Sequence, residues 1–358
     1  PILWIHWLSK KNIKMTRQES LVMKGIAILL MLWLHLFNMQ TPLYSPLFYI
    51  GDNPVERYLT CLTKPVGFFC FLSGYGMHVL YEKGKDKHRW SRIGKLYIHW
   101  WIILSIYIIV YQLITSTHIE IINHPTTHAF NYETIIKNIT AFDTSWYHPG
   151  WFLFPYMCLS LFAFNLFELT ARLKVWQILL FFWILGLMVG VFITRNSDFV
   201  YSHRLVANIA SFISLMPAFM FGAMAHKTKI IVKMQCKTRR NALMWCVLIV
   251  FLIFVCWLHM SIWGGFYPAI FTILFLASPR WTWVDKMLAH LGKYSMDMWL
   301  IHAWLYYYLF KEEFYSLKYP IVIFGALVIS SLVCSYFVTI ISNFIYERAF
   351  NNNRNTCL

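Results

Sequence analysis

The stretch Lys24-Gly-Ile-Ala-Ile-Leu-Leu-Met-Leu-Trp-Leu-His35 decides how the rest of the chain is interpreted. It is an apolar run between a cation and an imidazole, and it predicts a membrane-spanning helix. Eleven steps of about 100° bring His35 back to within roughly 20° of Lys24, so both side chains share one helix face. At about 1.5 Å per residue they lie about 16 Å apart, close to half a bilayer's hydrocarbon core of about 30 Å. With Lys24 at a membrane surface, His35 lies near mid-membrane, where an ionisable side chain indicates function.

The composition of the whole chain predicts an integral membrane protein. Hydrophobic residues make up 59% and charged residues 13% of the 358 residues, whereas soluble domains average about 45–50% and about 25%. The formal net charge is +16, but the basic residues lie in short loops between apolar stretches, so we expect no nucleic-acid partner. The eight cysteines show no CxxC or CxxH spacing, which predicts neither a disulfide framework nor a metal site.

Ten apolar stretches approach or reach the length that crosses a bilayer as a helix. We therefore predict an all-α fold, a polytopic membrane bundle of about ten transmembrane helices. The second, eighth and ninth stretches are short. The ten stretches are Leu21–Gln40, Val66–Tyr81, Leu96–Thr115, Trp151–Leu169, Val175–Ile193, Leu205–Ala225, Leu243–His259, Phe266–Leu276, Ser295–Phe310 and Pro320–Tyr346.

The distribution of basic residues predicts the orientation of these helices. With the N-terminus in the cytoplasm, the inner segments hold 24 Lys and Arg residues and the outer segments hold 7. Basic residues favour cytoplasmic loops, so both termini are predicted to be cytoplasmic. Residues 16–350 are expected to form one membrane domain, with a short cytoplasmic tail over 351–358. Residues 1–15 are expected to be an N-terminal extension. Position 1 is not Met and Met15 is a candidate start, so whether residues 1–14 are native stays open.

His35 is the first candidate for chemistry. The structural alternative is a buried histidine that is hydrogen-bonded to a neighbouring helix. Burial favours the neutral imidazole, whose free lone pair is what a general base requires at pH 7. Asn38, one turn further along, lies on the same face and is a candidate for orienting the ring.

Further candidates lie near the second and third apolar stretches. Ser73 and Gly74 fall within an aromatic stretch, where small residues allow close helix packing. Arg89 and Arg92 share a helix face at the predicted cytoplasmic end of the third stretch. Their charge either sets the topology and contacts lipid headgroups or holds the phosphates of a cytosolic ligand.

Two later segments place polar or aromatic residues at the ends of apolar stretches. Trp151 follows His148 where an outer loop enters the fourth stretch, and such a tryptophan is usually an interfacial anchor. Ser295 begins the ninth stretch, and His302 lies two turns further along on the same side. The outer loop Ser116–Gly150 holds four histidines at irregular spacing, which does not favour a metal site.

Several function classes lack their motifs in this sequence. It has no Walker A loop, no HExxH, no GxSxG and no Cys/His metal spacing, so no bound metal is expected. Asp297 is the only acid well inside a predicted span, whereas a proton-coupled carrier is expected to hold paired acids there.

Taken in this order, the motifs resemble those of the membrane acyltransferase 3 family. The family's basic residue, ten residues and histidine are matched by Lys24 and His35. Its FFxxSG motif is similar to Phe68-Phe-Cys-Phe-Leu-Ser-Gly74, which is one residue longer than the shortest form, and its Arg-x-x-Arg is matched by Arg89 and Arg92.

The resemblance continues to the end of the chain. A tryptophan before the fourth span looks like Trp151, and a late Ser…Leu-Ile-His looks like Ser295 with Leu300-Ile-His302. The similarity covers roughly residues 16–346. Many members carry Arg where this chain has Lys24, which cannot make a bidentate contact. The hydrolase-like domain fused to some members is expected to be absent.

The resemblance implies an O-acyltransferase in the bacterial cytoplasmic membrane, in contact with membrane lipids. It would move an acetyl or other acyl group from cytoplasmic acetyl-CoA, a co-substrate and not a bound cofactor, to a hydroxyl of a cell-envelope glycan or lipid-linked glycan. His35 would be the general base, and Lys24, Arg89 and Arg92 would bind the donor. The supporting residues would be Asn38, Ser73, Trp151, Ser295 and His302.

Some alternatives stay open at this point. Direct transfer and an acetyl-His intermediate both fit, and either Ser73 or Trp151 is a candidate oxyanion stabiliser. The acceptor, the acyl group and the oligomeric state are not determined by the sequence. In a different class, the chain is a multi-span transporter or flippase of a lipid or glycan intermediate, with His35 as a gating or proton-relay group.

Overall fold

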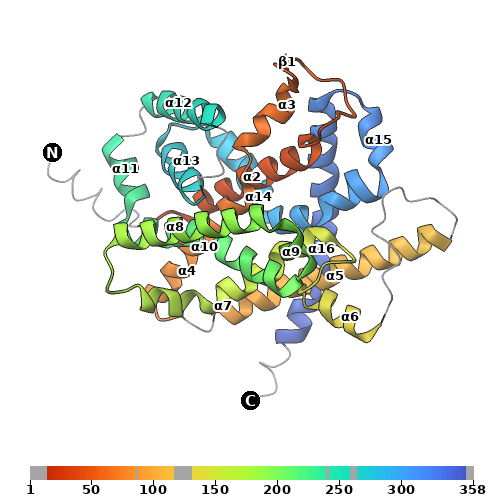
Figure 1. The fold of residues 1–358 in the computed structure, drawn as a ribbon, viewed down its shortest axis with the longest axis horizontal. Coiled ribbons are helices and arrows are strands. Elements are labelled where there is room, and N and C mark those ends of the chain that lie inside the picture. The colour runs from red at the N-terminus through yellow and green to blue at the C-terminus, as the bar shows by residue number, and fades with distance from the viewer. Residues whose placement is uncertain (1–13, 86–87, 117–130, 239–241, 259–263, 352–358) are drawn as a thin grey trace.

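The fold is a bundle of helices with one small hairpin (Figure 1). The computed structural model describes residues 14–85, 88–116, 131–238, 242–258 and 264–351. Strand β1 (Tyr49–Ile50) pairs antiparallel with β2 (Asn53–Pro54). The α-helices are α2 (Arg17–Phe37), α3 (Val55–Tyr58), α4 (Pro65–Glu82), α5 (His88–Ser116), α6 (Tyr132–Ile139), α7 (Leu153–Leu169), α8 (Val175–Arg195), α9 (Ser197–Ser202), α10 (Arg204–Thr228), α11 (Ile230–Thr238), α12 (Leu243–Leu258), α13 (Phe266–Ala277), α14 (Thr282–Ala303), α15 (Lys311–Ser316) and α16 (Pro320–Asn351).

Each of the ten predicted stretches overlaps one of these helices, which confirms the all-α class. In the described part of the chain, 6 helices are long and apolar enough to cross a membrane by length and composition. These are α2, α5, α7 with the preceding 3-10 turn η2 (His148–Phe152), α8, α10 and α16. Helices α12 and α13 are apolar but shorter. The count of ten spans and the cytoplasmic placement of both termini stay predictions.

The predicted start of the ninth stretch at Ser295 is wrong. Helix α14 begins at Thr282, and a π-helical segment, η4 (Trp304–Leu309), follows its end. Polar residues in the first half of α14 hid the helix from a search for apolar runs, because Lys286 and Lys293 lie on its exposed face. Ser295 therefore lies inside a helix, buried, and its hydroxyl donates to the Gly292 carbonyl at 3.0 Å.

Local sequence fixes where α2 begins. The Thr16 hydroxyl accepts a hydrogen bond from the Glu19 amide at 3.1 Å, and the Glu19 carboxylate accepts one from the Thr16 amide at 2.8 Å. This capping box satisfies backbone donors that the first helical turn leaves unpaired. The helix that carries Lys24 and His35 thus has a defined start.

Two pairs of glycines bring the central helices into close contact. A Cβ on Gly25 would lie 2.0 Å from the Leu288 carbonyl oxygen, and one on Gly292 would lie 1.9 Å from that of Leu21, so α2 and α14 touch backbone to backbone. Helices α4 and α10 meet in the same way, through Gly74 against Phe219 and Gly222 against Phe71. Small residues at helix interfaces allow this approach in membrane proteins.

We expect Gly222→Val to lower the thermal stability of the protein in detergent. The new side chain would collide with the Phe71 backbone at 1.9 Å, and overpacking of a tight core costs about 1–3 kcal/mol or more. Gly190→Val is the matched control, since a Cβ on Gly190 meets nothing within 4 Å. Equal melting temperatures for the two variants, measured by fluorescence during heating, would contradict the close packing of α4 on α10.

A buried polar network joins α5, α14 and α16. The His99 Nδ1 atom lies 2.5 Å from Asp297 Oδ1, and the Thr339 hydroxyl donates to Asp297 Oδ2 at 2.8 Å. Both carboxylate oxygens of Asp297 are therefore paired, as a buried charge requires. Asp297 serves to hold three helices together and lines neither cavity described below.

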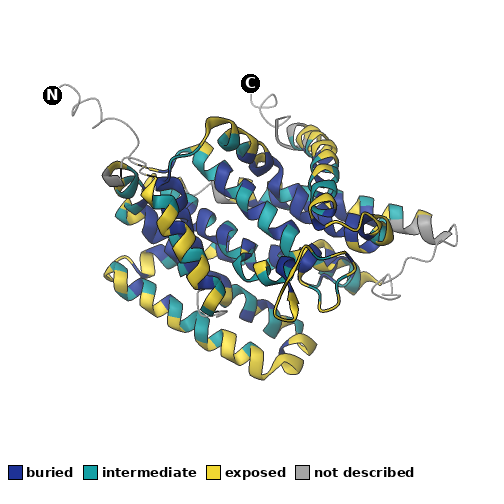
Figure 2. Cartoon of the chain, turned by 90° about the horizontal axis from the view of Figure 1, so that it is seen from above, coloured by how far each residue is buried: buried dark blue, intermediate teal, exposed yellow. Residues whose placement is uncertain are grey.

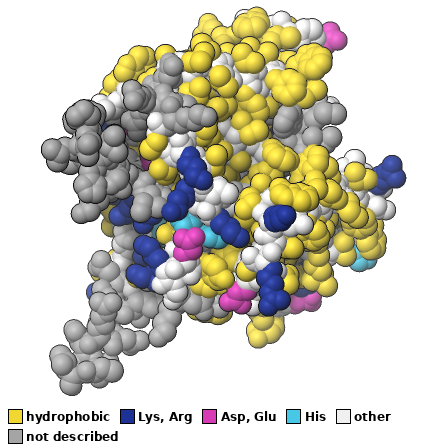
Figure 3. All heavy atoms as spheres, turned by 90° about the vertical axis from the view of Figure 1, so that its left-hand side faces the viewer, with side chains coloured by type: hydrophobic (Ala, Val, Ile, Leu, Met, Phe, Trp, Pro, Cys, Tyr) yellow, Lys and Arg dark blue, Asp and Glu magenta, His cyan; other side chains and the backbone are white. Residues whose placement is uncertain are grey.

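The outer surface of the bundle is largely apolar. Buried residues gather in the interior of the bundle (Figure 2). Helices α8, α12 and α16 carry exposed hydrophobic side chains such as Phe181, Val250 and Ile329. Hydrophobic side chains cover much of the face shown in Figure 3. Large apolar surfaces of this kind mark contact with lipid or another protein, which fits an integral membrane protein.

Two cysteines far apart in the sequence meet beside the short 3-10 turn η1 (Leu59–Leu62). The Cys61 and Cys256 sulfur atoms lie 3.0 Å apart, joining η1 to α12. We expect a copper–phenanthroline oxidant to link these two thiols, detected as one crosslinked peptide by mass spectrometry. Cys246, exposed and earlier on α12, is the control. A peptide that links Cys61 to Cys246 instead would contradict the placement of α12.

Candidate functional site

Two cavities open inside the bundle and share one wall. The larger has a volume of about 760 Å³ and is lined by His35, and we name it the His35 cavity. The smaller has a volume of about 350 Å³ and is lined by Lys24, and we name it the Lys24 cavity. The residues that line both cavities are Met31, Val66, Phe152 and Trp299.

Helix α2 contributes to both cavities through one face. Lys24 lines the smaller cavity, Met31 lines both, and His35 lines the larger. Their spacing of seven and four residues repeats every two turns and every turn of a helix, so the three side chains follow one stripe. The predicted common face of Lys24 and His35 is therefore the face that meets the two cavities.

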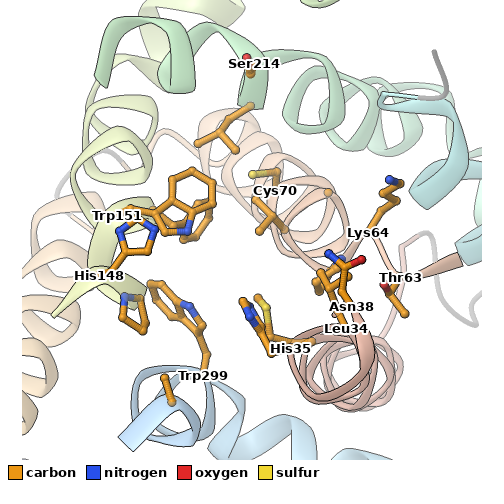
Figure 4. A pocket seen from close by; sticks show the side chains of 18 of the residues that line it. Leu34, His35, Asn38, Thr63, Lys64, Cys70, His148, Trp151, Ser214 and Trp299 are labelled. Atoms are coloured by element: carbon orange, nitrogen blue, oxygen red, sulfur yellow. The ribbon is translucent and has the colours of Figure 1, made fainter. Parts of the chain in front are cut away.

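The His35 cavity is built from several elements. Figure 4 shows His35, His148, Trp151 and Trp299 around one space, with Asn38 beside the end of α2. The His35 side chain, in the last turn of α2, is exposed to this space. An imidazole with an accessible ring nitrogen in such a cavity can accept a proton from a bound hydroxyl.

His302 lies behind His35 and lines neither cavity. The two ring centroids are 4.9 Å apart, and His302 is completely buried. Its Nδ1 atom lies 2.6 Å from the Trp299 carbonyl oxygen. A carbonyl only accepts hydrogen bonds, so Nδ1 carries the proton, and Nε2 is a buried acceptor with no partner among the described residues. The arrangement suits a residue that supports the position of His35.

Asn38 lies just beyond the end of α2. Its backbone amide donates to the Leu34 carbonyl at 3.0 Å and thereby caps the helix. Its side chain lines the His35 cavity, but within the described ranges no hydrogen bond joins its amide to His35. Orientation of the imidazole by Asn38 stays a prediction.

The Lys24 cavity is cationic on one side and holds a chain of hydrogen bonds. Arg92 lines it, and its guanidinium lies 2.8 Å from the Met77 sulfur and 3.3 Å from the Tyr156 hydroxyl. The same hydroxyl lies 2.8 Å from the Ser73 hydroxyl. Tyr156 therefore links two residues that the sequence motifs place on different helices.

The other predicted site residues divide between the two cavities. Ser295 lines the Lys24 cavity and Trp151 lines the His35 cavity. The adjacent residues Ser73 and Gly74 of the second motif have different surroundings. Ser73 lines the Lys24 cavity, and Gly74 packs against α10. Arg89 lies in α5, three residues before Arg92, but its side chain is outside the described residues.

Sequence reasoning missed several residues at this site. Tyr156 and Phe152 lie within the apolar fourth stretch, where aromatic residues usually indicate lipid contact or packing. His148 was noted only as part of the loop before Trp151, and it lines the His35 cavity. Only the four-residue spacing of Phe152, at the end of η2, and Tyr156, in the first turn of α7, gave a signal for a shared face.

The site combines an accessible imidazole in one cavity with cations at the next. A basic cavity favours an anionic ligand, and Arg and Lys are the usual partners of phosphate. A wall of four side chains separates that ligand from a second molecule beside His35. The geometry therefore suits transfer of a small group between two bound molecules.

The comparisons with known proteins give one match. The family model described as acyltransferase domain, the third of that name, matches residues 21–340. No curated protein and no solved structure matches this chain. The matched range includes the described residues of both cavities.

Proposed function

From the premise that this chain belongs to the membrane acyltransferase 3 family, we propose that it is an O-acetyltransferase of the bacterial cytoplasmic membrane. It moves an acetyl group from cytoplasmic acetyl-CoA to a hydroxyl of a cell-envelope glycan or glycolipid. The observation that carries the proposal is the shared wall between a cationic cavity and a cavity that exposes His35.

The donor occupies the Lys24 cavity. Lys24 and Arg92 hold the phosphates of the CoA nucleotide. Arg89, three residues before Arg92 on α5, stays a predicted donor-binding residue. The pantetheine arm is long and narrow, which suits a volume of about 350 Å³. It extends toward Met31 and Trp299, which brings the thioester to the shared wall.

The acceptor occupies the His35 cavity. Tryptophan rings at 151 and 299 offer flat apolar faces for the C–H side of a sugar ring. Asn38 and Ser214 offer hydrogen-bonding groups for hydroxyls. A mixture of aromatic walls and a few polar groups is typical of small-molecule sites.

His35 acts as the general base. Its imidazole takes the proton from the acceptor hydroxyl while that oxygen attacks the thioester carbonyl carbon. The tetrahedral intermediate collapses, the C–S bond breaks, and the imidazolium returns the proton to the departing CoA thiolate. His302 supports the ring of His35 from behind. Ser73 is the candidate oxyanion stabiliser on the donor side, and Trp151 is the candidate on the acceptor side.

The test is an assay of purified protein in lipid vesicles with acetyl-CoA and envelope glycan fractions. The proposal predicts release of free CoA thiol that depends on the glycan, with the mass gain of one acetyl group on the glycan. Movement of a glycan across the vesicle membrane without any thioester consumption would overturn the proposal in favour of a carrier. If only a larger acyl group is transferred to the glycan, acetyl-CoA is not the donor.

A further inference from the structure

Two histidines and a glutamate form a compact cluster between α4 and α10, away from both cavities. The Nδ1 atoms of His78 and His226 lie 3.0 Å apart, and Glu82 Oε1 lies 3.5 Å from the first and 3.8 Å from the second. Both histidines are buried, with 5% and 7% of their surface exposed, whereas Glu82 reaches solvent. None of the three lines the His35 cavity or the Lys24 cavity.

The separation of the two Nδ1 atoms, 3.0 Å, is that of a hydrogen bond, but hydrogen bonds do not account for the two contacts of Glu82. The longer N–O separations, 3.5 and 3.8 Å, exceed those of ordinary hydrogen bonds, about 2.7–3.2 Å. A tetrahedral ion with ligands at about 2.0–2.1 Å separates neighbouring ligand atoms by about 3.3–3.4 Å. The three observed edges, 3.0, 3.5 and 3.8 Å, have this mean length. One ion can therefore reach all three atoms at bonding distance.

We propose that His78, Glu82 and His226 bind a divalent transition-metal ion of the Zn²⁺ class. Two imidazoles and one carboxylate suit Zn²⁺, whereas Mg²⁺ and Ca²⁺ prefer oxygen ligands alone. All three ligand atoms lie within 4.8 Å of one another.

The surroundings explain why the carboxylate is needed. Figure 3 shows His and acidic side chains on one face with Lys and Arg gathered around them. Lys227 and Lys229 act electrostatically on the two histidines, and such positive charge opposes a bound cation. Glu82 offsets part of that repulsion, so loss of its charge should weaken binding strongly.

The ion would link α4 to α10 near the Lys24 cavity. His78 directly follows Met77, whose sulfur contacts the Arg92 guanidinium at 2.8 Å. The role is therefore structural, in holding the end of the helix that also carries Ser73. Metal binding does not depend on the proposed acetyl transfer, because the ligands belong to neither cavity.

The experiment measures metal content and affinity without an activity assay. The full chain is purified in detergent with a tag that contains no histidine, stripped with EDTA and titrated with Zn²⁺. The wild type is expected to retain one Zn²⁺ per chain, and Co²⁺ in its place is expected to give the intense visible absorption of a tetrahedral site. Glu82→Gln and His226→Ala are expected to weaken Zn²⁺ binding by about 10–100-fold or more.

His203→Ala is the matched control, since His203 is exposed and contacts only nearby groups of its own chain segment. It should bind Zn²⁺ as the wild type does. Glu82→Gln changes an exposed side chain and keeps the proposal testable where His226→Ala fails to fold. Equal Zn²⁺ affinity in the wild type and Glu82→Gln, or Co²⁺ spectra typical of octahedral coordination, would overturn the proposal.

Discussion

His35→Ala is expected to abolish acetyl transfer while the protein stays folded in the membrane. Loss of a positioned general base costs about 10²–10⁴-fold in rate. The His35 side chain is exposed to its cavity, so its removal creates no new buried group without a partner and should change stability little. The measurement is the initial rate of glycan-dependent thiol release, with the melting temperature as the check on folding.

The control for this variant is the same substitution elsewhere. His203→Ala removes an imidazole that lines neither cavity and should retain full activity. His302→Ala should lower kcat through the position of His35 and alter stability as well, because His302 is completely buried. Full activity of His35→Ala would remove His35 from the mechanism.

Arg92→Ala is expected to raise the KM for acetyl-CoA far more than the KM for the acceptor. A hydrogen bond to a charged group contributes about 1.5–3 kcal/mol, which corresponds to about 10–150-fold in affinity. Arg92→Lys should recover part of the loss, since it keeps the charge but not the bidentate contact. The measurement is a pair of saturation curves, one for each substrate.

Two further variants separate donor binding from a general charge effect. Arg172→Ala removes an exposed cation between α7 and α8 that lines neither cavity, and it should leave both KM values unchanged. Tyr156→Phe removes the hydroxyl that lies between Arg92 and Ser73 and should have a smaller effect than Arg92→Ala. An unchanged donor KM in Arg92→Ala would return that residue to a role in topology.

The helices were predictable where the sequence is continuously apolar. Such stretches have few ways to satisfy their backbone in lipid other than as helices, and each of the ten overlaps one. The start of α14 was missed because its first half is polar on the exposed face. Which helices touch was not predictable, because Gly25 lies against Leu288 and Gly74 against Phe219 only after folding.

Part of the candidate site could likewise be predicted from the sequence, and part could not. The common face of Lys24 and His35 follows from helix geometry, and both residues do line cavities. Their separation into two cavities by Met31 and Trp299 depends on helices distant in sequence. The metal cluster was hidden for the same reason, because His226 joins the pair on α4 across 148 residues.

Sealed membrane vesicles of opposite orientation test the central claim most directly. Labelled acetyl-CoA does not cross a bilayer, so it reaches only the face that is exposed to the medium. We predict labelled envelope glycan when the face proposed to be cytoplasmic, with the Lys24 cavity, is outward, and none from the same vesicles carrying His35→Ala. Transfer of label only when the opposite face is outward, or equally in both orientations, would contradict entry of the donor through the Lys24 cavity.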